Sequence, residues 1–167
     1  MQKRSYLLFL FYLCVIIPGC GQMTYEEKLA SLYKNTVPTI KPAELLEKQN
    51  ENKPIFILDI RNSEEYEVSH LKGAQLVDYE SFKIDNLDEL PKDAEIIVYC
   101  SVGYRSERVG EKLLDNGFTN VKNLYGGIFE WKNQNLEVYN SNLQPTDSVH
   151  TYNKKWSKWL RQGIKVY

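Results

Sequence analysis

Cysteine and glycine are scarce in this chain of 167 residues, which contains three cysteines and nine glycines. So few cysteines exclude a disulfide-stapled scaffold, and so few glycines exclude a collagen-like repeat. No heptad pattern of apolar residues persists, which excludes a coiled coil. The formal net charge is only −1, so the chain lacks the basic field that attracts nucleic acid, and we expect no nucleic-acid partner.

The composition is that of a globular protein, because hydrophobic residues make up 43% of the chain and charged residues 26%. Short apolar runs predict strands, and the two continuous runs at 55–60 and 95–100 are typical of strands buried on both faces. Strands are expected at 55–60, 74–77, 95–100 and 121–125, and helices at 42–49, 62–68, 104–116 and 126–135. This alternation predicts an α/β fold with a mostly parallel central sheet and helices on both faces.

The first twenty residues have the pattern of an export signal. Lys3 and Arg4 precede about 15 largely apolar residues, fewer than the roughly 20 that a membrane span needs. The stretch from Ile17 to Cys20 resembles the lipobox of bacterial lipoprotein signals, with Pro18 as an unusual residue within it. The resemblance implies that Cys20 carries lipid and anchors the protein to a bacterial membrane in the cell envelope, facing the periplasm or the exterior. A plain secretory signal and an uncleaved anchor are the alternatives.

These patterns divide the chain into four parts. We expect a lipoprotein-type signal peptide at 1–19, a tether or N-terminal helix at 20–41, a folded domain at 42–140, and a C-terminal extension with a short helix at 141–167.

After processing, Cys100 is expected to be the single thiol of the folded part, because Cys14 leaves with the signal and Cys20 carries lipid. A lone cysteine in an exported protein requires an explanation. His70 and His150 are the only histidines, too few with one thiol to indicate a zinc site. We therefore expect no metal and no other cofactor.

Cys100 stands where chemistry is expected in such a fold, at the carboxyl end of a buried strand. A short loop with Gly103 follows, and then a helix begins. Successive loop N–H groups and the positive end of the helix form an anion-binding nest, and Arg105 adds a positive charge. These features favour the thiolate and make Cys100 a candidate nucleophile. The alternative is a buried cysteine that serves only as a small hydrophobic residue.

Three sequence blocks, in order, resemble the rhodanese family of sulfurtransferases. Residues 55–74 resemble the signature D-x-R-x-x-x-E-[FY]-x-x-x-H-[IL]-x-G-A, residues 100–106 the active-site loop C-x-x-G-x-R-S, and residues 123–131 the closing L-x-G-G-x-x-x-W block. The resemblance covers about 42–140. It implies a rhodanese-like fold and transfer of sulfane sulfur through a Cys100 persulfide. The donor would be thiosulfate, a persulfide or a polysulfide, and the acceptor a thiol or another thiophile.

The length of the loop distinguishes sulfur transfer from phosphatase chemistry. Phosphatases with a related cysteine loop have five residues between cysteine and arginine, whereas four residues separate Cys100 from Arg105. The shorter loop suits one sulfur atom and is cramped for a tetrahedral phosphate.

The loop residues are candidates for substrate binding, and they are Ser101, Val102, Gly103, Tyr104, Arg105 and Ser106. Arg105 is expected either to bind an anionic donor or to hold the loop by pairing with a carboxylate. Ser106 is expected to cap the helix, with a hydrogen bond to the sulfur as the alternative. Tyr104 is expected to form a wall of the pocket.

Residues outside the loop are expected to support it. Asp59 and Arg61 lie at the end of a neighbouring strand and are interpreted as scaffolding, with Arg61 paired to Glu65 across one helical turn. The resemblance implies a structural role for His70, and Trp131 is expected in the core.

Trp156, Trp159 and Leu160 recur at helical spacing in the C-terminal extension, among several lysines and arginines. A helix packed on the domain with a solvated basic face is favoured, and a helix lying on the membrane surface is the alternative.

Three function classes remain, in order of preference. The first is a sulfurtransferase enzyme, the second a non-catalytic or sulfur-carrying partner module in the cell envelope, and the third a phosphatase or arsenate reductase. The partners expected are a small-molecule sulfur donor, a thiol acceptor and the membrane, and the sequence indicates no particular protein partner.

Overall fold

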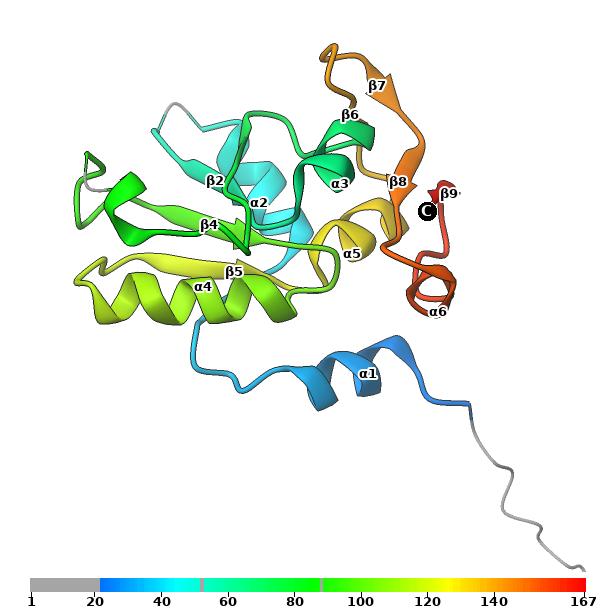
Figure 1. The fold of residues 1–167 in the computed structure, drawn as a ribbon, viewed down its shortest axis with the longest axis horizontal. Coiled ribbons are helices and arrows are strands. Elements are labelled where there is room, and N and C mark those ends of the chain that lie inside the picture. The colour runs from blue at the N-terminus through cyan, green and yellow to red at the C-terminus, as the bar shows by residue number, and fades with distance from the viewer. Residues whose placement is uncertain (1–21, 52, 88) are drawn as a thin grey trace, which may run out of the picture.

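The computed structural model describes residues 22–51, 53–87 and 89–167, and its centre is a five-stranded sheet (Figure 1). The strand order is β1 (Thr39–Ile40), β5 (Val121–Leu124), β4 (Ile96–Tyr99), β2 (Phe56–Asp59) and β3 (Ala74–Leu76), and all neighbours run parallel. The predicted α/β fold with a parallel sheet is confirmed.

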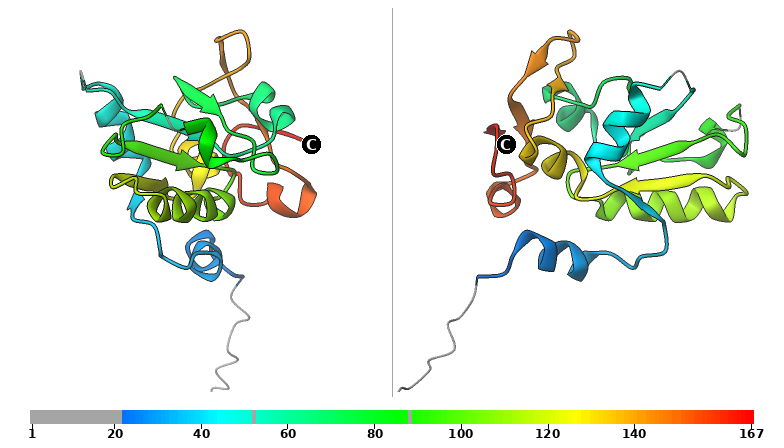
Figure 2. Two further views of the ribbon diagram at one scale, coloured as in Figure 1. Left: turned by 60° about the vertical axis from the view of Figure 1, so that its left-hand side comes forward. Right: turned by 180° about the vertical axis from the view of Figure 1, so that it is seen from behind.

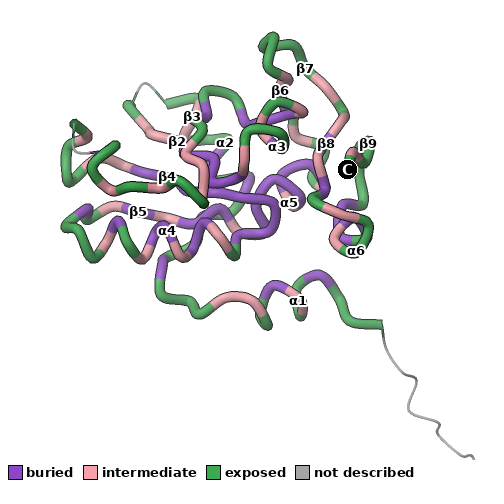
Figure 3. Tube along the Cα trace, viewed as in Figure 1, coloured by how far each residue is buried: buried purple, intermediate pink, exposed green. Residues whose placement is uncertain are grey.

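Two hydrophobic clusters cover the two faces of the sheet. Leu58 and Val98 face α4 (Tyr104–Asp115), whose Val109 and Leu113 are fully buried. Ile57, Ile97 and Leu124 belong to the other cluster, with α2 (Pro42–Gln49) and α5 (Gly127–Asn133). The central strands are therefore buried on both sides (Figure 3), as their continuous apolar runs predict.

The helix α3 (Ser63–Val68) begins with the capping box expected from the sequence. The side chain of Asn62 accepts from the N–H of Glu65 at 2.8 Å, and the Glu65 carboxylate accepts from the N–H of Asn62 at 3.3 Å. The acidic segment after β3 holds one short 3-10 turn, η1 (Ile84–Leu87).

The segment before the domain is folded onto it. The helix α1 (Tyr25–Leu32) buries Tyr25 and Leu29 in the same cluster as α5. The two residues of β1 then pair with β5 at the sheet edge. The sequence does not predict β1, because two residues carry no periodic pattern.

The C-terminal extension is more structured than the single helix expected. The strand β7 (Pro145–Thr146) pairs with β6 (Val138–Tyr139) of the domain, and β8 (Ser148–His150) pairs with β9 (Ile164–Val166) within the extension. The short helix α6 (Lys154–Ser157) lies between β8 and β9. Figures 1 and 2 show this extension beside the end of the sheet where the chain leaves β4 for α4.

The C-terminal helix is shorter than its spacing of apolar residues predicts. It ends at Ser157, so Trp159 and Leu160 follow it. Both are buried nevertheless, and Trp159 stacks on Tyr25 of α1 with ring centroids 5.6 Å apart. The lysines of α6 are exposed, which agrees with the favoured arrangement of a packed segment with a solvated basic face.

The residues of the expected signal peptide and Cys20 lie outside the described part of the chain. Within residues 22–51, 53–87 and 89–167, no helix has both the length and the apolar character to cross a membrane.

Candidate active site

Cys100 follows the last residue of β4, the middle strand of the sheet, and is buried with an exposed fraction of 1%. Its Sγ accepts a hydrogen bond from the N–H of Gly103 at 3.2 Å. Helix α4 begins at Tyr104, and the N–H groups of its first turn have no partner within the helix. The sulfur therefore lies at the positive end of a 12-residue helix, where a negative charge is stabilised.

Glycine is required at position 103 for two reasons. Its φ is +94°, and a Cβ there would collide with the hydroxyl of Tyr33. That hydroxyl donates to the carbonyl oxygen of Val102 at 2.8 Å and accepts from the N–H of Gly126 at 2.9 Å. A tyrosine between α1 and β1 thus fastens the loop, a role that no sequence pattern indicates.

Gly126 and Gly127, at the start of α5, let that helix approach the loop from the other side. The N–H groups of Ile128 and Phe129 donate to the carbonyl oxygens of Cys100 and Ser101 at 2.9 and 3.1 Å. A Cβ on Gly127 would meet these backbone atoms. The closing sequence block at 123–131 therefore holds the backbone of the loop that carries the thiol.

Arg105 is paired with a carboxylate, which is one of its two expected roles, while binding of an anionic donor by Arg105 stays a prediction. Its Nη2 donates to Glu65 Oε1 at 2.8 Å and to Ser101 Oγ at 3.2 Å, and Ser101 Oγ donates to the same carboxylate oxygen at 2.8 Å. Burial tends to raise the pKa of Glu65, but the hydrogen bonds from Arg105 and Ser101, together with the charges of Arg105 and Arg61, outweigh it and hold that pKa below its ordinary value. Burial likewise opposes the charge of Arg105, but Cys100 and Glu65 raise its pKa further above the usual range.

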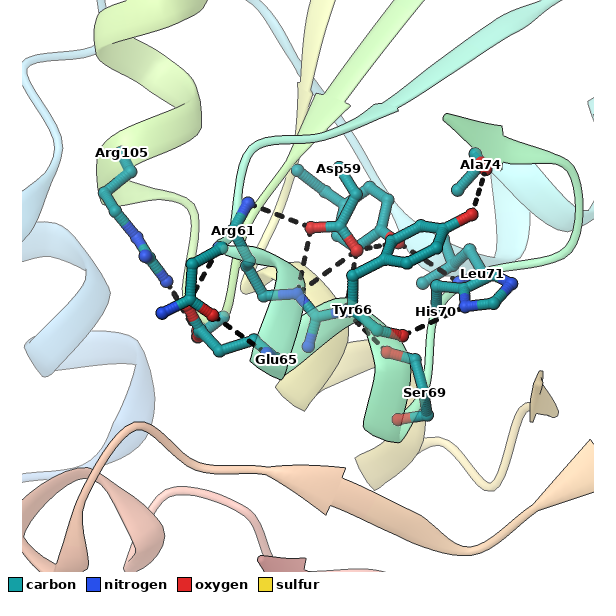
Figure 4. A network of polar contacts seen from close by, with 12 residues as sticks. Asp59, Arg61, Glu65, Tyr66, Ser69, His70, Leu71, Ala74 and Arg105 are labelled. Carbon is teal, nitrogen blue, oxygen red and sulfur yellow. Dashed lines mark hydrogen bonds and ion pairs between the residues drawn. The ribbon is translucent and has the colours of Figure 1, made fainter. Parts of the chain in front are cut away.

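Arg61 does not pair with Glu65, so that expectation was wrong. Its guanidinium contacts Asp59 instead, with Nη2 at 2.6 Å from Oδ2, and donates to the carbonyl oxygen of Ser69 at 2.6 Å (Figure 4). Tyr99 donates to the same carboxylate. All three side chains are fully buried. Asp59 and Arg61 therefore act as scaffolding, and Glu65 is left free to hold Arg105.

His70 has contacts that fit a structural role. Its Nδ1 lies 3.1 Å from the carbonyl oxygen of Tyr66, and its ring stacks on that of Tyr66 at 4.0 Å. Trp131 is buried, as expected.

Ser106 neither caps the helix nor contacts the sulfur, so both expected roles were wrong. Its Oγ donates to Asn123 Oδ1 on β5 at 2.8 Å, and the amide of Asn123 donates to the carbonyl oxygen of Gly103 at 2.9 Å. The residue before the helix is a glycine without a capping side chain. Ser106 therefore ties the first turn of α4 to the neighbouring strand.

A cavity of about 440 Å³ opens beside Cys100. Tyr104 forms part of its wall, as expected, with 45% of its surface exposed. The other lining residues come from the loop and from four further segments, and they are Leu32, Asn62, Asp78, Tyr79, Glu80, Ser101, Val102, Arg105, Tyr152 and Trp156. Most of these were missed, because the sequence does not show which distant segments meet. No group of three or more metal-ligating side chains occurs among the residues that the structure describes.

A family model described as rhodanese-like domain matches residues 41–134. The chain belongs to the rhodanese-like family. A rhodanese-like domain protein of Staphylococcus aureus has 30% sequence identity and a TM-score of 0.53, over 64% of this chain and 96% of that one. A Bacillus halodurans protein has 26% identity and a TM-score of 0.57, over 71% and 88% of the two chains.

Curated relatives contain the domain within longer chains. The chain is 33% identical over 103 residues to a tRNA uridine(34) hydroxylase of Cytophaga hutchinsonii, which is 59% of this chain and 32% of that protein. It is 31% identical over 97 residues to a probable adenylyltransferase/sulfurtransferase of Mycobacterium tuberculosis, which is 58% of this chain and 25% of that protein. The rhodanese-like domain is thus related to sulfurtransferases, and the matched part spans a third or less of these relatives.

Proposed function

We propose that the protein is a sulfurtransferase that carries sulfane sulfur as a persulfide on Cys100. The observation that supports this most directly is the position of Cys100 Sγ, 3.2 Å from the N–H of Gly103 at the start of α4. This environment stabilises an anionic sulfur before and after sulfur is added. The cavity beside the thiol gives a small donor access to it.

The transfer takes two steps. The Cys100 thiolate attacks the outer sulfur of the donor, a new S–S bond forms, and the S–S bond of the donor breaks with its electron pair on the leaving group. With thiosulfate the leaving group is sulfite. In the second step a thiol, or cyanide in an assay, attacks the outer sulfur of the persulfide and restores the thiolate.

The short loop argues against the phosphatase alternative. Gly103 lies only three residues after Cys100 and already donates to its sulfur, and Arg105 is turned to Glu65. A phosphate on Cys100 would need a ring of donors around three further oxygens and a guanidinium free to contact them.

Intact mass spectrometry tests the proposal. Incubation with thiosulfate or polysulfide should add about 32 Da, one sulfur atom, to the wild type. Cys100→Ser should remain unmodified and transfer no sulfur, because serine replaces the only described thiol with a group of similar shape. An unchanged circular dichroism spectrum would show that the variant is folded. Transfer by the variant at the wild-type rate would refute the role of Cys100.

Turnover separates an enzyme from the sulfur-carrying partner module. We expect repeated thiocyanate formation from a sulfane donor and cyanide at catalytic amounts of protein. A carrier would acquire the sulfur once and release it only to its own partner.

We propose further that Cys20 carries lipid and holds the domain at a bacterial membrane. Four residues separate Cys20 from Tyr25, which is buried in the fold. Five residue steps span at most about 17 Å, so an anchored domain would stay close to the bilayer. Cys20→Ala should abolish labelling by a radioactive fatty acid in the expressing bacterium. Unchanged labelling of this variant would contradict the anchor.

A further inference from the structure

The wall of the Cys100 cavity includes residues from outside the stretch that matches the family. That stretch is 41–134, whereas Leu32 belongs to α1 and Tyr152 and Trp156 belong to the C-terminal extension. The extension is fastened to the domain, because Leu160 is fully buried. The flanking segments are therefore fixed parts of the site.

Aromatic side chains from the matched stretch and from the C-terminal extension line the cavity together. Tyr79 and Tyr104 line the cavity together with Tyr152 and Trp156. Tyr152 adopts φ +63°, which is unusual for a tyrosine, and its N–H donates to His150 Nδ1 at 3.1 Å. Such backbone conformations persist where the surrounding structure holds them, and they cluster at ligand sites.

The charges on the wall oppose an anionic donor. Arg105 is the only basic residue among the described residues that line the cavity. Its guanidinium is paired with Glu65 at 2.8 Å and lies 5.8 Å from the ring centroid of Tyr152. Asp78 and Glu80 add two negative charges to the lining. Because Glu65 offsets the charge of Arg105, the remaining field disfavours thiosulfate, which carries two negative charges.

We propose that this cavity selects sulfane-sulfur donors in which an aromatic or aliphatic group carries the sulfur, and that it discriminates against thiosulfate. The inference rests on the proposed sulfur transfer at Cys100 and names the class of donor. With an organic persulfide, the Cys100 thiolate attacks the outer sulfur and a thiolate leaves. With an organic thiosulfonate, it attacks the terminal sulfur, the bond from that sulfur to the sulfonyl group breaks, and a sulfinate leaves with the electron pair.

Three donors separate the effects of the ring and of the charge. Benzenethiosulfonate and methanethiosulfonate share a reacting group and a single negative charge, and thiosulfate adds the second charge. Thiocyanate formation with cyanide as acceptor gives kcat/KM for each. We expect benzenethiosulfonate to exceed methanethiosulfonate by about 10-fold, the size of a good aromatic contact. Methanethiosulfonate should in turn exceed thiosulfate.

Variants of the wall test which side chains carry the preference. Trp156→Ala and Tyr152→Gly should each lower the ratio of benzenethiosulfonate to methanethiosulfonate by about 5-fold. Glycine suits the φ of residue 152, so this variant removes the ring without straining the backbone. Glu80→Gln should raise the ratio of thiosulfate to methanethiosulfonate by about 3-fold. Lys155→Ala, an exposed change in α6 outside the cavity, should leave all three values unchanged.

The outcomes distinguish the two proposals. If the wild type uses thiosulfate as well as benzenethiosulfonate, or if folded Tyr152→Gly keeps the wild-type ratio, the inferred donor class is wrong while sulfur transfer at Cys100 stands. If the wild type turns over none of the three donors and none of them adds the mass of one sulfur atom to the protein, sulfur transfer at Cys100 is refuted, and the inferred donor class is refuted with it.

Discussion

Replacing Glu65 by glutamine tests how the loop is held. The Glu65 carboxylate is fully buried and binds Arg105 at 2.8 Å, Ser101 at 2.8 Å and the N–H of Asn62 at 3.3 Å. Glutamine keeps an acceptor oxygen but loses the charge that offsets Arg105. A hydrogen bond to a charged group is worth about 1.5–3 kcal/mol, and we expect the free energy of unfolding at pH 7 to fall by that amount.

The effect of Glu65→Gln on the free energy of unfolding should depend on pH. The pKa of Glu65 is lowered in the folded protein from the ordinary value of 4.5. Its charge therefore stabilises the fold fully above about pH 5, and the contribution is lost as the pH falls through the lower folded value. The difference in unfolding free energy between wild type and Glu65→Gln should be constant from pH 5 to 7 and shrink below about pH 4.5.

Urea denaturation followed by circular dichroism at several pH values measures this difference. Glu64→Gln is the matched control, since Glu64 is the exposed neighbour on the same helix, and it should change stability by less than about 0.5 kcal/mol. A Glu65→Gln effect as small as that of the control, or one that stays constant down to pH 3, would refute the reasoning.

Three further changes probe the loop. Tyr33→Phe removes both hydrogen bonds of the hydroxyl and should cost about 1–2 kcal/mol in urea denaturation, whereas an unchanged midpoint would show that the contact does not hold the loop. Gly103→Ala should cost more than Gly117→Ala by about 1–3 kcal/mol, because both have positive φ but only Gly103 abuts Tyr33; equal losses would contradict the collision. A glycine inserted between Val102 and Gly103 should lower sulfur transfer by about 10²–10³, and unchanged turnover would mean that the loop is no tight cradle.

Local sequence patterns were enough to predict the central strands and helices of the domain and the position of the thiol. Continuous apolar runs identified β2 and β4, because strands covered on both faces leave no polar side. Asn62 and Glu65 identified the start of α3, because a capping box is a local interaction across three residues. The order of strand, Cys100, glycine loop and helix located the site, since these neighbours lie on one stretch of chain.

The surroundings of that thiol depend on contacts between distant parts of the chain. By charge, the Glu65 carboxylate could pair with either Arg61 or Arg105. Asp59, at the buried end of β2, pairs with Arg61, so Glu65 pairs with Arg105. Likewise, the aromatic residues of the C-terminal extension gave no indication that Tyr152 and Trp156 line the cavity. Such contacts join residues far apart in sequence, so they depend on how strands and helices meet in space, which local patterns do not encode.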